Sequence, residues 1–242
     1  MNYDPLARLY DLQYERYRDD LPFYTRLADD YGGPVLELGA GTARVSAALA
    51  RAGHEVVALE PSLEMIRRGQ ARLEREGLTT VSYHQGDMRF TRLERPFPLV
   101  IAPFNTLMHA YTLSDQDATL QTVRAHLAPG GRFAFDLYTP NFGQLDVLRL
   151  EPEWAHVGGG ELFLLQTHDP DAQLLTSHYF LDTVGADGLL RRQRSTLKQR
   201  YFHRFELERA LLQNGFTNLQ MYGDFSRVRY HARATHLICT AH

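Results

Sequence analysis

The chain of 242 residues contains one cysteine and no apolar run that approaches membrane-spanning length. A lone Cys239 cannot form an intrachain disulfide, and it excludes a metal site built from several cysteines. Because it lies in an apolar run, at 237–239, we expect a buried and unreactive thiol. The first residues are too polar for a secretory signal. We therefore predict a cytoplasmic protein with no membrane partner and no metal.

An excess of basic residues is also absent, since 26 Lys and Arg stand against 29 Asp and Glu. A net charge of -3 gives no reason to expect a nucleic-acid partner. One basic cluster lies at 191–200, and we expect a solvated strand face there, with an acidic ligand or nucleic acid as the alternative. The cluster consists of Arg191, Arg192, Arg194, Lys198 and Arg200. The length and the 44% hydrophobic content predict one domain, and we expect a monomer or a homodimer.

A phosphate-binding Gly-Lys-Ser/Thr loop is missing, but a different glycine turn is present. The segment 35–42, Val-Leu-Glu-Leu-Gly-Ala-Gly-Thr, is an apolar run that turns through two glycines, and Glu60 follows 19 residues after Gly41. Glycine permits a tight turn and close approach of a ligand, and a carboxylate after the next strand can accept from both ribose hydroxyls. These features predict a nucleoside site.

Two residues argue that this nucleoside carries no diphosphate. A dinucleotide fingerprint requires a small residue at its third glycine position. When Gly39 is taken as the first glycine, Arg44 occupies that position in this chain. Glu37, directly before the loop, would repel a pyrophosphate and attract a cationic amino group. The loop is therefore expected to bind a nucleoside joined to an amino acid.

Strand and helix signals alternate through the first part of the chain, with helical patterns before it. Short apolar strands are expected at 34–38, 55–59, 80–84, 99–103 and 132–137, separated by helical segments. Repeated strand–helix units predict a Rossmann-like α/β fold whose parallel sheet is covered by helices on both faces. Strand-like patterns at 161–168, 174–184 and 189–201 predict an antiparallel β insertion. A helix at 205–214 and strands near 217–222 and 235–240 follow.

Four segments, in order and at the right spacing, resemble the motifs of class I S-adenosylmethionine-dependent methyltransferases. Residues 37–41 resemble the first motif, 58–62 the acidic ribose loop, 85–88 the adenine loop and 128–131 the turn before the fifth strand. The resemblance covers residues 30–140. It implies a seven-stranded, mostly parallel sheet that ends in an edge hairpin, and S-adenosyl-L-methionine as cofactor.

The resemblance also implies a division of this single domain, 1–242, into four parts. Residues 1–30 would form an N-terminal helical lid, and 31–141 the cofactor-binding core. The meander at 151–203 would cap the substrate, and 204–242 would supply the last helix and the edge hairpin.

Roles for individual residues follow from the same resemblance. Glu60 would bind the ribose, Glu37 the methionine ammonium and Asp87 the adenine amino group. In the alternatives, Glu37 serves the helix dipole or pairs with Arg44, and Asp87 caps a helical turn. The expected cofactor-binding residues are Glu37, Gly39, Ala40, Gly41, Glu60, Pro61, Asp87, Met88, Pro103 and Phe104.

The acceptor side carries fewer signals. The segment 105–109, Asn-Thr-Leu-Met-His, resembles small-molecule N-methyltransferases, and His109 is the candidate general base. Tyr14 is a second catalytic candidate, since Tyr10, Tyr14 and Tyr17 could form an aromatic lid over an ammonium substrate. Ordinary packing is the alternative for these side chains. The expected substrate-binding residues are Tyr10, Asn105 and Tyr138.

The sequence thus predicts a methyltransferase that acts on a small-molecule acceptor, at nitrogen rather than oxygen. A nicotinamide-dependent oxidoreductase would share the sheet and the acidic ribose ligand. A non-catalytic module that binds S-adenosylmethionine is the second alternative.

Overall fold

The computed structural model describes residues 7–14, 16–151 and 160–242. Its helices are α1 (Ala7–Tyr14), α2 (Leu21–Tyr31), α3 (Arg44–Arg51), α4 (Leu63–Arg75), α5 (Leu113–His126) and α6 (Arg204–Gln213), with short 3-10 helices η1 (Thr106–His109) and η2 (Phe142–Gln144). One sheet contains β1 (Val35–Leu38), β2 (Val56–Glu60), β3 (Val81–Gln85), β4 (Phe97–Ala102), β5 (Leu127–Tyr138), β10 (Gln220–Tyr222) and β11 (His236–Ala241). The other contains β6 (Arg149–Leu150), β7 (Gly160–Asp169), β8 (Leu174–Val184) and β9 (Leu190–Arg200).

The seven-stranded sheet has the order β10-β11-β5-β4-β1-β2-β3, and it is mostly parallel. Strands β1 to β5 pair in parallel, whereas β11 runs antiparallel to β5 and β10 antiparallel to β11. The predicted fold class and the edge hairpin are therefore confirmed. Because parallel strands end on one side, the loops after β1, β2, β3 and β4 gather at a single edge of this sheet.

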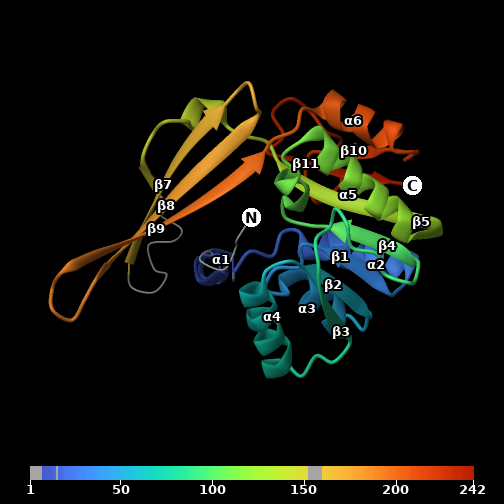
Figure 1. Ribbon diagram of the computed structural model, residues 1–242, viewed down its shortest axis with the longest axis horizontal. Helices are drawn as coiled ribbons and strands as arrows, with labels where there is room; N and C mark the ends of the chain where they lie inside the picture. The colour runs from blue at the N-terminus through green and yellow to red at the C-terminus, as the bar shows by residue number, and fades with distance from the viewer. Residues whose placement is uncertain (1–6, 15, 152–159) are drawn as a thin grey trace.

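Helices cover both faces of the seven-stranded sheet (Figure 1). On one face α2 and α3 contribute apolar side chains such as Phe23 and Leu49 to a core with Ile101. On the other face α5 and α6 pack Val123 and Leu211 against the sheet. The short strands β1 and β2 are buried along their whole length, as expected for strands covered on both sides.

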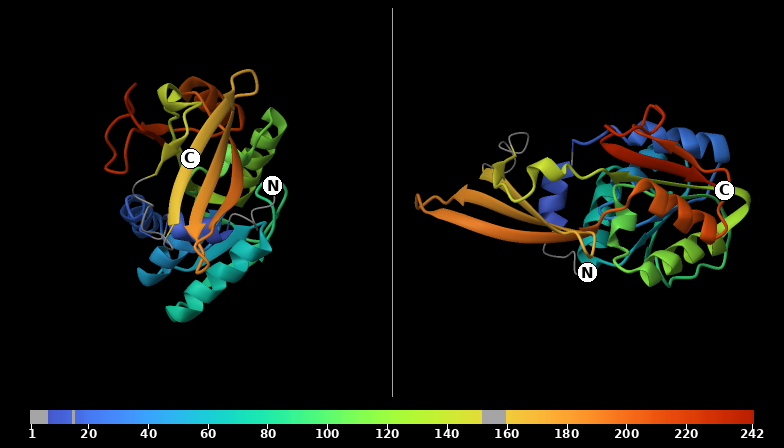
Figure 2. Two further views of the ribbon diagram at one scale, coloured as in Figure 1. Left: turned by 90° about the vertical axis from the view of Figure 1, so that its left-hand side faces the viewer. Right: turned by 90° about the horizontal axis from the view of Figure 1, so that it is seen from above.

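The four-stranded antiparallel sheet, β6-β7-β8-β9, projects from one side of the core, and its β8–β9 hairpin extends farthest from it (Figures 1 and 2). Helix α1 lies between the two sheets, and Leu9 packs against Leu162, Leu164 and Tyr179. On its other side, Asp11 forms ion pairs with two arginines of α4, at 3.3 and 3.4 Å. The N-terminal helix is thereby attached both to the insertion and to the core.

Three boundaries differ from the sequence predictions. The sequence pattern predicts a helix over 118–127, but α5 already begins at Leu113, because Thr112 and Asp115 form a capping box. Strand β5 begins at Leu127 and includes 129–131, which we expected to be a turn. Strand β6 is too short to give a periodic pattern, and it was not predicted. The predicted lid and cap lie partly outside the described residues, at 1–6, 15 and 152–159.

The basic cluster at 191–200 lies on β9, where arginines are paired with carboxylates. Arg192 pairs with Asp182 at 2.6 Å, and Arg200 with Glu206 at 3.1 Å. Cys239 is fully buried in β11, as predicted. None of the helices in the described ranges is long and apolar enough to cross a bilayer.

Candidate active site

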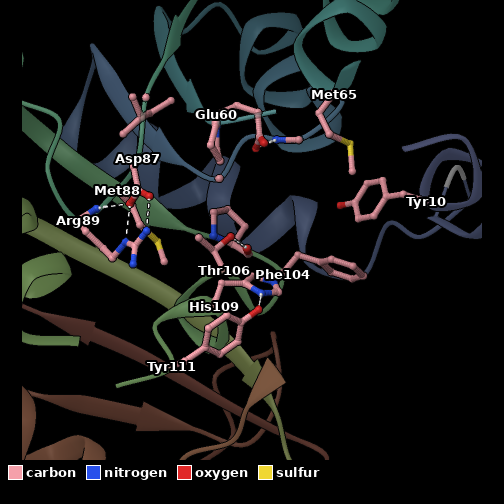
Figure 3. Close-up of a pocket in the computed structure, with 16 residues that line it drawn as sticks. Tyr10, Glu60, Met65, Asp87, Met88, Arg89, Phe104, Thr106, His109 and Tyr111 are labelled. Atoms are coloured by element: carbon pink, nitrogen blue, oxygen red, sulfur yellow. Dashed lines mark hydrogen bonds and ion pairs between the residues drawn. The ribbon is translucent and has the colours of Figure 1, made fainter. Parts of the chain in front are cut away.

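A cavity of about 250 Å³ lies at the edge where β1, β2, β3 and β4 end (Figure 3). Asp87, Met88 and Arg89 lie at one end of it, Tyr10 and Phe104 lie at the other, and Glu60 lies between them. The predicted site residues that line it are Tyr10, Gly39, Gly41, Glu60, Pro61, Asp87, Met88, Pro103, Phe104 and His109. The sequence thus placed residues from five separate segments around one cavity.

The two glycines of the first loop have backbone conformations that other residues rarely adopt. Gly39 has φ +64° and Gly41 has φ +55°. A Cβ on Gly39 would lie 2.7 Å from Cγ2 of Thr106, so this position has no room for a side chain. At Gly41, by contrast, no protein atom lies closer than 4.0 Å to an added Cβ. Gly41 therefore leaves open space beside the cavity, which a bound molecule could occupy.

Glu60 is held in place by the backbone of two loops. Its Oε2 accepts from the Gly41 N–H at 3.0 Å, and its Oε1 accepts from the Ser62 N–H at 2.9 Å. The residue is only 5% exposed, yet it lines the cavity. Each carboxylate oxygen can accept a further hydrogen bond, and vicinal ribose hydroxyls are suitable donors.

Asp87 is bound to an arginine that the sequence reading missed. Arg89 donates from Nη2 to Asp87 at 2.6 Å and from Nη1 to Asp115 at 2.7 Å. The hydrogen bond from the Arg89 side chain is the largest cause that lowers the pKa of Asp87. The backbone N–H of Arg89 also donates to the Asp87 side chain at 2.9 Å. This contact resembles the alternative role of Asp87, in which it caps a helical turn. Asp-x-Arg directly after a strand is the signal that could have identified Arg89.

At the other end of the cavity, four aromatic rings meet. Tyr10, Tyr14 and Tyr17 surround Phe104, with ring centroids 6.0, 4.6 and 5.4 Å from it. Phe104 has φ +55°, and its N–H donates to Asp136 at 2.8 Å. This backbone hydrogen bond directs the ring toward the N-terminal helix. Burial raises the pKa of Tyr14 well above its usual value, so its hydroxyl keeps its proton at neutral pH.

Arg44 packs against the rings of the aromatic cluster. It forms a bidentate ion pair with Asp20, at 2.5 and 2.6 Å, and its guanidinium lies 4.9 Å from the Phe104 ring centre. Both ion-pair partners are almost completely buried. The alternative in which Arg44 pairs with Glu37 is therefore wrong, because Asp20 takes that place.

Glu37 does not line the cavity. It is 2% exposed behind the glycine loop, and its carboxylate accepts a hydrogen bond from Ser46 of α3. Burial raises the pKa of Glu37 to about 8. Contact with an ammonium group, directly or through water, remains a prediction.

His109 lines the cavity next to Tyr111, where the four-stranded sheet meets the core. Its Nδ1 lies 3.5 Å from the Tyr111 hydroxyl, which donates to the backbone carbonyl of Lys198 at 3.0 Å. Burial is the main cause that lowers the pKa of His109 to about 4. The imidazole is therefore neutral at pH 7 and can accept a hydrogen bond, but it binds a proton less readily than an exposed histidine.

Four further predicted residues lie outside the cavity lining. Ala40 is buried in the loop, and Tyr14 packs behind Phe104. The side chain of Asn105 accepts from the backbone N–H of Tyr138 at 2.6 Å, and thereby fixes the loop after β4. The Tyr138 hydroxyl is buried. Direct substrate contact by Asn105 and Tyr138 stays a prediction.

The charges of the cavity indicate what it can hold. The Arg89 guanidinium is balanced by the carboxylates of Asp87 and Asp115, and the Glu60 carboxylate also lines the cavity. Such a cavity disfavours a diphosphate and favours a ligand that carries positive charge. The cavity therefore fits S-adenosylmethionine. The Glu60 carboxylate suits the ribose, the open space at Gly41 suits the adjoining chain, and the aromatic end suits the sulfonium. Among the described residues, no cluster of His, Cys, Asp or Glu is arranged to hold a metal ion.

The comparisons with known proteins agree with this geometry. A methyltransferase-domain family model matches residues 35–131. The chain is 37% identical over 112 residues to the cypemycin N-terminal methyltransferase of a Streptomyces species, a match that covers 45% of this chain and 43% of that one. The chain spans about half the length of the first curated relatives it matches.

Two solved structures share the fold. The CcbJ methyltransferase from Streptomyces caelestis superposes with a TM-score of 0.82 at 24% identity, over 94% of this chain and 93% of that one. CalS10, an amino pentose methyltransferase from Micromonospora echinaspora solved with S-adenosylmethionine bound, gives a TM-score of 0.75 at 19% identity, over 96% of each chain.

Fold, motifs and family match define one class of protein. Residues 35–131 match a methyltransferase-domain family model, and the chain shares the fold of solved methyltransferases, so the predicted resemblance to class I S-adenosylmethionine-dependent methyltransferases is confirmed. S-adenosylmethionine is the cofactor of that class.

Proposed function

We propose that the protein transfers a methyl group from S-adenosylmethionine to a nitrogen atom of a small-molecule acceptor. The observation that carries the proposal is the cavity itself. It joins a carboxylate held by two backbone amides, Glu60, to an aromatic end formed around Phe104. When bound, S-adenosylmethionine supplies a methyl group on a positively charged sulfur, which leaves without needing an acid.

The residues at the aromatic end would position the acceptor and exclude water, which are the main tasks in such a displacement. Phe104 and Tyr10 line the cavity, and Tyr14 and Tyr17 pack behind them. A neutral His109 can accept a hydrogen bond from an amine and orient its lone pair. In this arrangement α1 serves as part of a lid, and the sheet at 160–200 serves as part of a cap.

Nitrogen is favoured over oxygen by the names of two similar proteins. The cypemycin enzyme is an N-terminal methyltransferase, and CalS10 is an amino pentose methyltransferase. The first name refers to an N-terminus and the second to an amino sugar, so an amino group is common to both. We therefore place amines and amino sugars first among the acceptors to be tested.

The proposal is tested with methyl-labelled S-adenosylmethionine and a panel of amines, amino sugars, phenols and carboxylates. We expect label in amine products and the release of S-adenosylhomocysteine. Transfer only to phenols or carboxylates would contradict the nitrogen assignment. Tight cofactor binding without transfer to any member of a broad panel would favour the non-catalytic module.

The nicotinamide-dependent alternative is separated by calorimetry. We expect heat of binding with S-adenosylhomocysteine and none with NAD, because the carboxylates of the cavity repel a diphosphate. Binding of NAD in preference to S-adenosylhomocysteine would contradict the proposal.

A further inference from the structure

A second cavity, of about 380 Å³, lies between α6, β10 and the segment 223–230. In Figure 1, β10 is the edge strand of the seven-stranded sheet, and α6 lies beside it. None of its lining residues belongs to the cofactor cavity. The methyl-transfer chemistry described above does not use it.

Three arginines and one glutamate line this second cavity, so its net charge is positive. Arg204 and Glu208 are one helical turn apart on α6 and therefore share a face. Arg227 and Arg229 approach from the segment after β10. An antiparallel bridge between Tyr222 and Arg229 fixes this segment beside the strand.

The two groups on α6 have polar atoms without partners. Nε of Arg204 and Oε2 of Glu208 are buried, and neither forms a hydrogen bond with a described residue. In the described part of the chain, Arg204 and Arg229 make no ion pair, whereas Arg227 reaches Asp30 at 3.8 Å. Arg204 is instead held over the rings of Phe205 and Tyr230, at 5.2 and 5.9 Å.

Buried polar groups without partners cost free energy. The chemistry of these two groups indicates which ligand groups could bind them. A guanidinium presents N–H donors in a planar fork that matches the oxygens of phosphate or carboxylate. A buried carboxylate oxygen accepts from an N–H or O–H. A ligand with an oxyanion alone would meet Arg204 but would be repelled by Glu208.

We propose that this cavity is a second small-molecule site, for a ligand that carries an oxyanion and, close to it, an amine or hydroxyl. Arg204 and Arg229 bind the oxyanion, and Glu208 accepts from the amine or hydroxyl. Phosphate and carboxylate are the two sources of the oxyanion. This proposal does not depend on the proposed methyl transfer, and it is tested separately.

The test is calorimetry on the full chain with three probes: phosphoethanolamine, inorganic phosphate and acetate. We expect phosphoethanolamine to bind most tightly, since it satisfies both Arg204 and Glu208. Arg204→Gln and Arg229→Gln should each weaken it about tenfold or more, the usual effect of losing a charge-assisted hydrogen bond. Arg209→Gln is the matched control, because Arg209 is an exposed arginine of α6 outside the cavity, and it should leave binding unchanged.

Glu208→Gln distinguishes the two halves of the site. Removing its negative charge should strengthen the binding of inorganic phosphate and weaken that of phosphoethanolamine. The same variants should bind S-adenosylhomocysteine as the unmodified protein does, which shows that they are folded. Comparison of phosphate with acetate identifies which oxyanion the arginines prefer.

The proposal is overturned if none of the three probes binds at millimolar concentration, because the cavity then holds only water. It is also overturned if Arg209→Gln weakens binding as much as Arg229→Gln, since this would indicate a general charge effect. If Glu208→Gln changed the affinities for inorganic phosphate and for phosphoethanolamine in the same direction, Glu208 would not be part of the site.

Discussion

The two ends of the cofactor cavity are built in different ways. Glu60 and, at the end beyond it, Asp87 are held by hydrogen bonds from the loops that follow the parallel strands: Glu60 by Gly41 and Ser62, and Asp87 by Arg89. At the Phe104 end, the contacts join distant segments, such as Tyr14 with Phe104 and Phe104 with Asp136. The first end is built from the loops that follow the parallel strands. The second depends on how the N-terminal helix and the antiparallel sheet pack on the core.

If this difference holds, the largest effect on stability should come from the buried ion pair below Phe104. Asp20→Ala leaves the Arg44 charge without its partner, and we expect a loss of about 3–5 kcal/mol in the free energy of unfolding. Urea denaturation measures it. Asp187→Ala is the control, because it breaks the exposed pair with Arg191 and should cost less than about 1 kcal/mol. Equal losses in both variants would contradict the account.

The second prediction concerns His109 at the same end. His109→Ala should lower the rate of methyl transfer about a hundredfold if the imidazole positions or deprotonates the acceptor. Because burial lowers the pKa of His109 to about 4, the unmodified protein should show an acid limb near pH 4. That limb should be absent in the variant. A rate and a pH profile that do not change would make His109 a packing residue.

At Glu60, the predicted effect is a loss of cofactor binding. Glu60→Ala removes a charged acceptor, and we expect S-adenosylhomocysteine to bind about 10- to 100-fold more weakly by calorimetry. Glu74→Gln, an exposed position of α4, serves as the control and should bind normally. Unchanged affinity in Glu60→Ala would remove this residue from the ribose site.

The last prediction concerns a pH dependence of stability that comes from Glu37. Its pKa rises from 4.5 to about 8 on folding, so the folded protein holds a proton that the unfolded chain has lost. Between pH 4.5 and 8 stability should therefore fall as pH rises, by up to about 1.4 kcal/mol per pH unit. Urea denaturation across this window should give a flatter dependence for Glu37→Gln. Parallel curves for the two proteins would show that Glu37 does not titrate in this way.

The predictability of the site from sequence follows the same division. The alternation of strands and helices, the glycine turn and Glu60 follow from local patterns, because apolar strands, paired glycines and an acid at a strand end are each visible in a few residues. Arg89 and the Asp20–Arg44 pair were missed, since the partner of a charge is set by packing. Strand β6 and the early start of α5 at Thr112 were missed because a two-residue strand and a single capping box have weak patterns.

The central claim is that the turn after β1 and the carboxylate after β2 bind the adenosine of S-adenosylmethionine. A crystal structure of the protein with S-adenosylhomocysteine tests it most directly. The account predicts the ribose hydroxyls within hydrogen-bonding distance of the Glu60 carboxylate, the adenine beside Asp87 and Met88, and the sulfur facing Phe104. A ligand bound at another place, or one whose ribose makes no contact with Glu60, would contradict it.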